Sequence, residues 1–233
     1  MESKIRRIIE NSIISAKKQK KEFLLFSRIM IFIQDPLVSE DVDFDEIVSI
    51  IEQSVSSHLF DNIDIIYIGQ HDELTDRELE AFYESGAIYI TNTLNDNLDY
   101  IENIVHENAH AIEERDGLQI YGDQKIQNEF LGKRKRLFHN IKSAGHDISG
   151  IDFMNPEFQM DLDDFLYREI GYDNLNYLIN GLFVNPYAAT SINEYFSSGV
   201  EKYFLDSDDR QRLKAFSPEL TKKIEELING NFS

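Results

Sequence analysis

Cysteine is missing from this 233-residue sequence, and proline is scarce, with only four residues. The absence of cysteine excludes a disulfide scaffold, a thiol nucleophile and any zinc or iron–sulfur site with cysteine ligands. A metal, if the protein holds one, must therefore be bound by histidine and carboxylate side chains.

Long apolar runs are also missing. No stretch reaches the roughly 18 apolar residues that a membrane-spanning helix needs. The first residues carry helically spaced apolar side chains interrupted by Lys and Arg, without the apolar core or the cleavage site of a signal peptide. We therefore expect a cytoplasmic protein with no membrane partner.

Basic residues are the minority among the charged side chains. Against 43 Asp and Glu stand 23 Lys and Arg, which gives a formal net charge of −20 and a pI near 4.6. Such a chain repels phosphate backbones, so we expect no nucleic-acid partner. A basic peptide or protein would be attracted, although the same charge also serves solubility. The sequence leaves the oligomeric state open.

The length and the 42% hydrophobic content predict a single domain over 1–233. Strands are predicted at 29–34, 64–69 and 87–91, and helices at Lys4 to about Lys21, 44–60 and about 75–84. After Leu98 helical patterns dominate, at 98–115, 123–143, 161–183, 189–205 and 217–229. The expected class is α+β, with a small twisted sheet and helices in an N-terminal lobe (about 1–97) and a mostly helical C-terminal part.

The strongest motif is His106-Glu107-Asn108-Ala109-His110, an HExxH pattern within the apolar rhythm of a predicted helix over about 98–115. Residues four apart lie on one face of a helix, so both imidazoles can point at one metal ion. Glu107 lies beside them, where it can accept a proton from metal-bound water. The alternative is a chance match of a short pattern.

A catalytic zinc site needs a third protein ligand, and several residues compete for this role. The metzincin motif requires a Gly where this sequence has Glu113, before a ligand at the position of Asp116, so that type is disfavoured. Glu129 follows His110 by 129 − 110 = 19 residues, the spacing of HExxH aminopeptidases. Glu194 lies on a predicted helix further along.

Tyr187 stands seven residues before Glu194, which is followed by Tyr195-Phe196-Ser197. This arrangement resembles the catalytic domain of anthrax lethal factor and its relatives, the clostridial Pro-Pro endopeptidases, which are zincin metallopeptidases of the gluzincin type. The charged and helical tail at 206–228 is similar to the closing segment of that family. Together the resemblance covers about 101–115 and 187–228.

The resemblance implies a zincin-like fold and one zinc ion per chain, held by His106, His110 and Glu194. It also implies Glu107 as the general base and Tyr187 as the group that stabilises the oxyanion. The interval from His110 to Glu194, 194 − 110 = 84 residues, is longer than in the family. We therefore expect an insertion at about 125–180 and a C-terminal helical lobe at about 181–233.

The sequence thus predicts a zinc-dependent endopeptidase that cuts a peptide or protein substrate, and the acidic net charge favours a basic one. The alternative is a zincin-fold binding or structural protein that retains zinc but lacks turnover. Glu107 and Tyr187 favour the enzyme, because neither is needed merely to hold a metal. The sequence does not indicate a cleavage-site preference.

Two further predictions concern the surroundings of the metal helix. Zincins bind substrate as an added antiparallel strand along an edge strand, so 87–91 is expected to be either that edge strand or a strand of the core sheet. The remaining histidines have no partner at ligand spacing and are expected to be surface or structural residues: His58, His71, His139 and His146.

Overall fold

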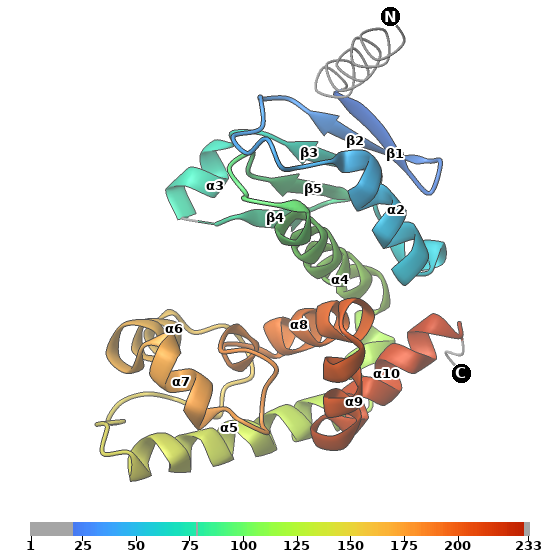
Figure 1. The fold of residues 1–233 in the computed structure, drawn as a ribbon. Helices are drawn as coiled ribbons and strands as arrows, with labels where there is room; N and C mark the ends of the chain where they lie inside the picture. The colour runs from blue at the N-terminus through green and yellow to red at the C-terminus, as the bar shows by residue number, and fades with distance from the viewer. Residues whose placement is uncertain (1–20, 78, 231–233) are drawn as a thin grey trace, which may run out of the picture.

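A mixed five-stranded sheet forms the first lobe of the computed structural model, which describes residues 21–77 and 79–230 (Figure 1). The strand order is β1-β2-β3-β5-β4. The three inner strands β2, β3 and β5 are parallel, whereas β1 and β4 pair antiparallel at the two edges. The strand bounds are β1 (Glu22–Leu25), β2 (Ile29–Ile33), β3 (Ile65–Ile68), β4 (Ala81–Glu84) and β5 (Ala87–Ile90).

Alternating burial along the strands gives the sheet one apolar inner face. Every second residue of β2 and β3 is buried, as period-two patterning requires. Helix α2 (Phe44–Ser54) packs near this face, and Asp43 caps it by accepting from the Asp45 backbone N–H. A short 3₁₀ turn, η1 (Ser57–Phe60), leads into β3, and α3 (Asp72–Arg77) connects β3 to β4.

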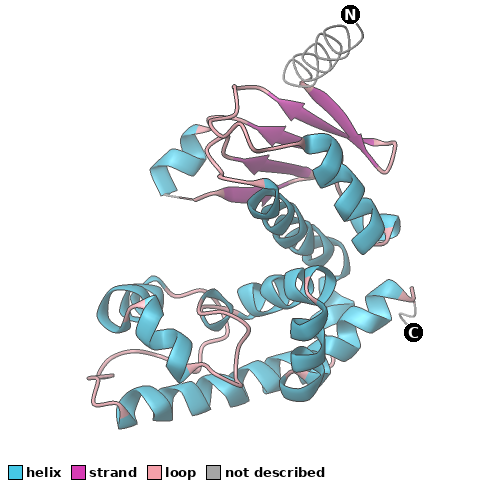
Figure 2. Cartoon of the chain, in the orientation of Figure 1, coloured by secondary structure: helices cyan, strands magenta, loops and turns pink. Residues whose placement is uncertain are grey.

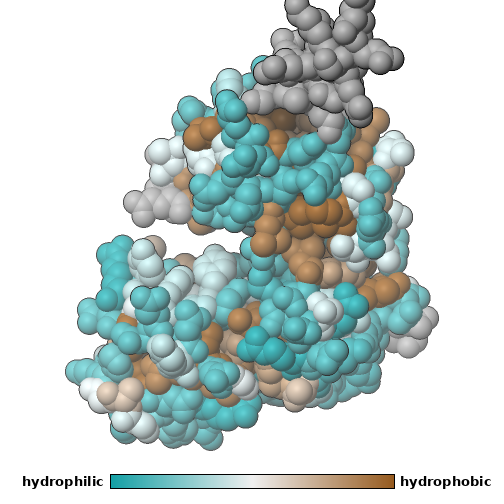
Figure 3. All heavy atoms as spheres, in the orientation of Figure 1, coloured by the Kyte–Doolittle hydropathy of each residue, from teal (hydrophilic) through white to brown (hydrophobic). Residues whose placement is uncertain are grey.

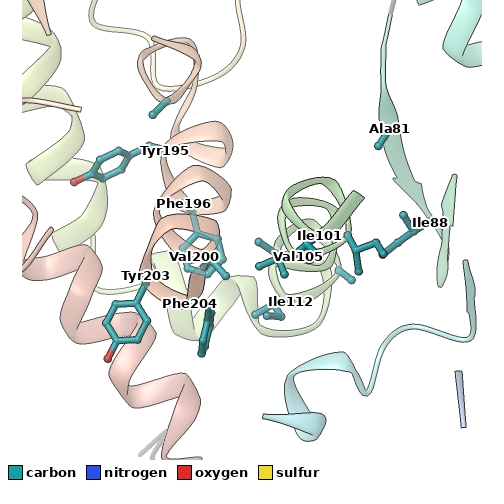
Figure 4. Close-up of a cluster of buried hydrophobic side chains, with 14 of the residues drawn as sticks. Ala81, Ile88, Ile101, Val105, Ile112, Tyr195, Phe196, Val200, Tyr203 and Phe204 are labelled. Carbon is teal, nitrogen blue, oxygen red and sulfur yellow. The ribbon is translucent and has the colours of Figure 1, made fainter. Parts of the chain in front are cut away.

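Helix α4 (Asn97–Tyr121) joins the two lobes. It packs against β4, β5 and α2 on one side and against α8 (Ile192–Leu205) on the other. Figure 4 shows this arrangement, with Ile101 facing Ile88 of the sheet, and Val105 and Ile112 on the side toward Phe196 and Val200 of α8. Because both sides of α4 are covered, its buried residues do not form one narrow stripe.

The second lobe contains no strand among the described residues and is built from helices (Figure 2). These are α5 (Lys125–Ser143), α6 (Met160–Asp164), the π-helix η2 (Phe165–Ile170), α7 (Tyr172–Leu178), η3 (Tyr187–Ala189), α8, α9 (Ser207–Phe216) and α10 (Pro218–Ile228). The first of them, α5, packs against α8 and α10, so the beginning of the expected insertion belongs to the core of this lobe.

The described residues confirm the α+β class and the division into a sheet-bearing part and a helical part. The basic helix predicted from Lys4 to about Lys21 lies outside the described residues, apart from its last residue. No helix in the described part of the chain is long and apolar enough to cross a membrane.

Several predicted element boundaries are wrong. The helix predicted at 75–84 ends at Arg77, and the aromatic residues of 81–84 form β4, because a tight turn at Ser85 and Gly86, both with positive φ, pairs them with β5. The helix predicted at 161–183 is interrupted at Gly171, whose φ of 76° ends the π-helix. Within the tail, Ser207–Phe216 forms α9, which is capped by Asp206.

The segment 87–91 is not the edge of the sheet. It forms β5, which lies between β3 and β4, so the expectation of a core strand is the correct one. The hydrogen-bonding edge next to α4 belongs to β4 instead. The strand β4 is not predicted from the sequence, because its four residues follow a Glu-rich stretch and fall within the helix predicted at about 75–84.

Candidate metal centre

The first half of the site comes from α4. His106 and His110 lie one helical turn apart, and their ring centroids are 5.2 Å from each other. Glu107 is buried between the helix and the sheet, where its carboxylate accepts a hydrogen bond from the Tyr83 backbone N–H of β4. The local sequence is therefore sufficient to place two imidazoles and one carboxylate together.

The second half of the site comes from α8. Ser191 caps this helix by accepting from the Glu194 backbone N–H, which fixes Glu194 in the first turn. The Glu194 carboxylate lies 3.1 Å from His106 Nε2 and 3.8 Å from His110 Nε2. One ligand atom from each of the three residues lies within 4.8 Å of the others. Such a set could hold a metal ion.

The two histidines and one carboxylate fit a catalytic zinc site by their chemistry. Among the described residues, this is the one group of three or more such side chains that could hold a metal. This group consists of the three residues that the sequence resemblance implies as ligands. Asp116 is not part of it.

Glu129, the competing third ligand, lies elsewhere. Its carboxylate accepts from the Tyr195 hydroxyl at 2.8 Å and from the Glu219 and Leu220 backbone N–H groups at 2.9 and 3.1 Å. These N–H groups belong to the first turn of α10, which has no capping side chain of its own. Glu129 therefore caps α10 from a distance and does not join the histidines.

Each histidine has a carboxylate on its other ring nitrogen. His106 Nδ1 lies 3.2 Å from Glu201 of α8, and His110 Nδ1 lies 2.8 Å from Glu113 of α4. A carboxylate at Nδ1 fixes the tautomer and orientation of a ligating imidazole and raises its basicity. Both Nε2 atoms are thus turned toward Glu194.

Further contacts hold these two carboxylates in place. Glu113 accepts from Asn193 of α8 at 2.8 Å and from the Tyr121 hydroxyl. Glu201 pairs with Lys202 at 2.8 Å, and Lys202 in turn pairs with Glu102 of α4 at 2.7 Å. The bonds from Asn193 and Lys202 cross between α4 and α8, so they tie the two halves of the site together.

Sequence reasoning missed Glu113 and Glu201 as supports of the histidines. Two signals were present. Glu113 follows His110 by three residues, so it lies on the same face of α4, and Glu201 follows Glu194 by seven residues, or about two turns of α8. A carboxylate on the face that is expected to be buried is itself a sign of a polar network.

The charges in the site are strongly coupled. Burial opposes the protonated form of His106, but hydrogen bonds to Glu194 and Glu201 outweigh it and raise its pKa to about 10. Burial favours the neutral form of Glu194, yet the bond to His106 and the charges of both histidines lower its pKa. Metal ligation requires neutral imidazoles, so a cation binding here would release these protons.

The carboxyl of Glu107 behaves differently. Burial raises its pKa, and the lowering effect of His110 and His106 does not fully compensate. A raised pKa suits a general base, because it brings the proton affinity of the carboxylate closer to neutral pH.

Tyr187 borders the same site. It lies in η3, just before α8, and its ring centroid is 6.2 Å from that of His106. Burial raises the pKa of Tyr187, and the charges of Glu194 and Glu107 raise it further. The phenol therefore keeps its proton and can act as a hydrogen-bond donor.

The segment that carries Tyr187 and Glu194 is held by a buried arginine. Arg134 of α5, fully buried, donates to Thr190 O at 3.1 Å and to Asn155 O at 3.3 Å. Thr190 in turn donates to Tyr187 O through its backbone N–H and its hydroxyl, both at 2.9 Å. The position of Tyr187 thus depends on contacts far away in the sequence.

An open cavity of about 450 Å³ adjoins His110. Its lining comes from the β4–β5 hairpin, from α4 and from the start of α8: Tyr83, Glu84, Ser85, His110, Glu113, Glu114 and Asn193. The space-filling view shows a hollow between the two lobes (Figure 3).

The other histidines lie apart from this group. His58 Nε2 contacts Leu227 O at 3.1 Å, the His71 ring packs on Tyr89, and the His139 ring packs on Phe138. His58, His71, His139 and His146 do not belong to the possible metal-binding group among the described residues.

Comparisons with known proteins identify no family for this chain. No family model, no curated protein and no solved structure matches the chain significantly. The class of site that the residues define is a possible metal centre of two histidines and one glutamate, with a further glutamate beside it.

Proposed function

We propose that the protein is a zinc-dependent endopeptidase of the zincin type. The observation that carries the proposal is the convergence of His106, His110 and Glu194, with Glu107 adjacent to the two histidines on α4. The sequence resemblance to the lethal factor catalytic domain and the Pro-Pro endopeptidases supports the same reading. So does the α+β architecture, in which the metal helix lies between a sheet and a helical lobe.

Zinc bound by the three ligands supplies Lewis-acid chemistry, since it lowers the pKa of water and polarises a carbonyl group. The protein's own residues carry the protons. Glu107 accepts a proton from the attacking water and returns it to the leaving amine. Its raised pKa and its fixed position against the Tyr83 N–H suit both steps.

Tyr187 completes the proposed machinery. Its protonated hydroxyl would donate a hydrogen bond to the oxyanion that develops from the scissile carbonyl. A donor of this kind typically stabilises the transition state by about 3 kcal/mol. Tyr187 is 36% exposed, so it can reach a substrate that lies in the hollow between the two lobes, which we call the cleft.

The open edge of β4 is the proposed substrate-binding strand. It is the outermost strand on the side of the sheet that packs against α4, and Tyr83 N–H connects it to Glu107. An extended peptide could add to such an edge through main-chain hydrogen bonds. The peptide would then lie along the cleft, with its scissile bond near the three ligands.

The experiment compares the zinc-loaded native protein with Glu107→Gln on a complex mixture of peptides, with new termini identified by mass spectrometry. We expect new termini with the native protein and a loss of several orders of magnitude in rate with Glu107→Gln, while zinc stays bound. A full rate in the variant would exclude Glu107 as the base. A native protein that binds zinc and cuts nothing would favour a binding protein of the same fold.

A further inference from the structure

Helix α5 carries two neighbouring cations, Lys133 and Arg134, that are fully buried in the second lobe. The helix runs along the base of this lobe, where it packs against α7, α8 and α10 (Figure 1). The hydrogen-bond acceptors of both side chains are backbone carbonyl groups and, for Lys133, one serine hydroxyl. Burying a charge on neutral acceptors alone is costly. We therefore expect the two cations to have roles that apolar side chains do not fill.

Lys133 joins parts of the lobe other than the loop that leads into α8. Its ammonium group donates to Leu182 O at 2.5 Å, to Phe216 O at 2.8 Å and to Ser217 Oγ at 2.7 Å. These acceptors lie before η3 and at the junction of α9 and α10. The same group lies 5.2 Å from the centroid of the Tyr195 ring, a contact that a methionine sulfur can replace.

Arg134 joins the loop that leads into α8 to a second loop. Its Nη2 donates to Thr190 O at 3.1 Å and to Asn155 O at 3.3 Å. A backbone bond from Ile192 N–H to Pro156 O, at 2.8 Å, connects the same two loops. Without the guanidinium the two carbonyl oxygens would lie close together without a donor, which is costly and drives them apart. One arginine nitrogen and one backbone bond therefore hold the loops side by side.

The loop that Arg134 holds carries two functional groups of the candidate site. Thr190, whose carbonyl accepts from Arg134, donates to Tyr187 O through its backbone N–H and its hydroxyl, both at 2.9 Å. The next residue, Ser191, caps α8 by accepting from the Glu194 backbone N–H at 3.1 Å. The contact with Arg134 thus lies between Tyr187 on one side and Glu194 on the other. A shift of Thr190 would move both.

The guanidinium group of Arg134 is not arranged for maximal stability. Its Nε and Nη1 atoms are buried and have no hydrogen-bond partner in the part of the chain that the structure describes. Burial lowers the pKa of the guanidinium to about 10, and the charge of Asp152 does not compensate for this effect. The side chain remains charged at neutral pH. Its unmet hydrogen-bonding capacity favours a role in geometry over a role in stability.

We propose that Arg134 is a positioning residue of the candidate site, which holds the loop before α8 so that Tyr187 and Glu194 reach the two histidines together. Arg134 belongs to the stretch 125–180, which the sequence resemblance does not cover. Its effect on turnover rests on the proposed peptidase function, whereas its effect on the metal centre needs no turnover. The two effects can therefore be measured separately.

The test compares Arg134→Met with Lys133→Met, its matched control. The two substitutions remove fully buried cations from adjacent positions of α5, and each introduces a flexible apolar side chain. Cobalt(II) replaces zinc as a spectroscopic probe, because its visible absorption spectrum reports the arrangement of its ligands. Urea denaturation gives the stability of each variant, and steady-state kinetics on a cleaved peptide gives kcat and KM.

We expect Arg134→Met to change the cobalt spectrum, to weaken cobalt binding about tenfold and to lower kcat at least about tenfold, because the loop carries a metal ligand and the oxyanion donor. Lys133→Met should leave the spectrum and kcat as in the native protein, even where its unfolding midpoint falls further. Arg134→Lys, which keeps a donor near the two carbonyl groups, should restore most of both. Adding Tyr187→Phe to Arg134→Met should cost less in kcat than Tyr187→Phe alone, because both act on the same donor.

A folded Arg134→Met protein with the native cobalt spectrum and the native kcat would overturn the proposal. So would equal changes in the two methionine variants, because Arg134 would then act through general packing only. If Arg134→Met does not fold, Arg134→Gln decides in the same way, since its shorter side chain leaves the two carbonyl groups without a shared donor. A native protein that binds cobalt but cuts no peptide would refute the peptidase function, while the cobalt spectra would still test Arg134.

Discussion

The two halves of the candidate site differ in what holds them. On α4, His106, Glu107 and His110 are placed by the pitch of a single helix. On the α8 side, Tyr187 and Glu194 reach the same point through tertiary contacts, including the bonds from Arg134 to Thr190 O and Asn155 O. One half is a local property of the sequence, and the other depends on the packing of the whole second lobe.

This difference predicts that the α8 half is the more vulnerable one. A substitution on α5 or α10, far from the histidines, can move Glu194 or Tyr187 without touching α4. The crossing contacts Asn193–Glu113 and Lys202–Glu102 keep the halves in register. Substitutions that affect one half and leave the other unchanged therefore test this difference.

Apart from the loss of Glu107 or of a metal ligand, the largest effect is expected at Tyr187. Tyr187→Phe removes only the hydroxyl, so zinc content and fold should stay as in the native protein. We expect kcat to fall about 100-fold or more, equivalent to about 3 kcal/mol, because the oxyanion loses a donor. Steady-state kinetics on a cleaved peptide measures this, and an unchanged kcat would assign Tyr187 to packing only.

The next effect concerns the carboxylates at the two Nδ1 atoms. Glu201→Gln and Glu113→Gln should each weaken zinc affinity about 10- to 100-fold, since the histidines lose orientation and basicity. Competition with a chromophoric chelator gives the affinities. Glu102→Gln, which alters only the Lys202 contact, is the matched control and should change the affinity less.

A smaller effect is expected on folding when Glu129 is replaced. Glu129→Ala removes the acceptor for two α10 N–H groups and for the Tyr195 hydroxyl. The free energy of unfolding should fall by about 1 to 2 kcal/mol, the usual value of a helix cap. Urea denaturation tests this, with Glu129→Gln as the milder control; loss of zinc in the folded variant would make Glu129 a ligand after all.

The smallest effect is expected at Gly199, where α8 packs closely on α10. A Cβ at this position would lie 2.5 Å from Leu220 Cδ2. Gly199→Ala should destabilise the protein by about 1 kcal/mol, because overpacking exceeds the gain in helix propensity. Gly132→Ala on α5, with no atom near the new Cβ, should instead stabilise slightly in the same thermal melt.

The sequence predicts the α4 half and the α8 half of the site to different extents. The HExxH spacing predicts the α4 half completely, because a helix fixes the relative positions of residues four apart. Glu194 could be selected over Glu129 only through a resemblance, since both follow a predicted helical Asn. What separates them is the contact of Glu129 with α10, a pairing 90 residues apart that no local pattern encodes.

Prediction of the fold has the same limit, because a local pattern does not encode pairing with a distant segment. The strands β2, β3 and β5 were recognisable because each is an unbroken apolar run that is rich in Ile. The edge strand β4 was not, since its four residues gain their conformation from pairing with β5 across the Ser85–Gly86 turn. The missing strand is the one proposed to receive the substrate.

The most direct test of the central claim is the zinc content per chain, measured by elemental analysis on the native protein, Glu194→Ala and Glu129→Ala. We predict about one zinc in the native protein and in Glu129→Ala, and little in Glu194→Ala. No zinc in the native protein, or loss of zinc from Glu129→Ala alone, would contradict the site formed by His106, His110 and Glu194.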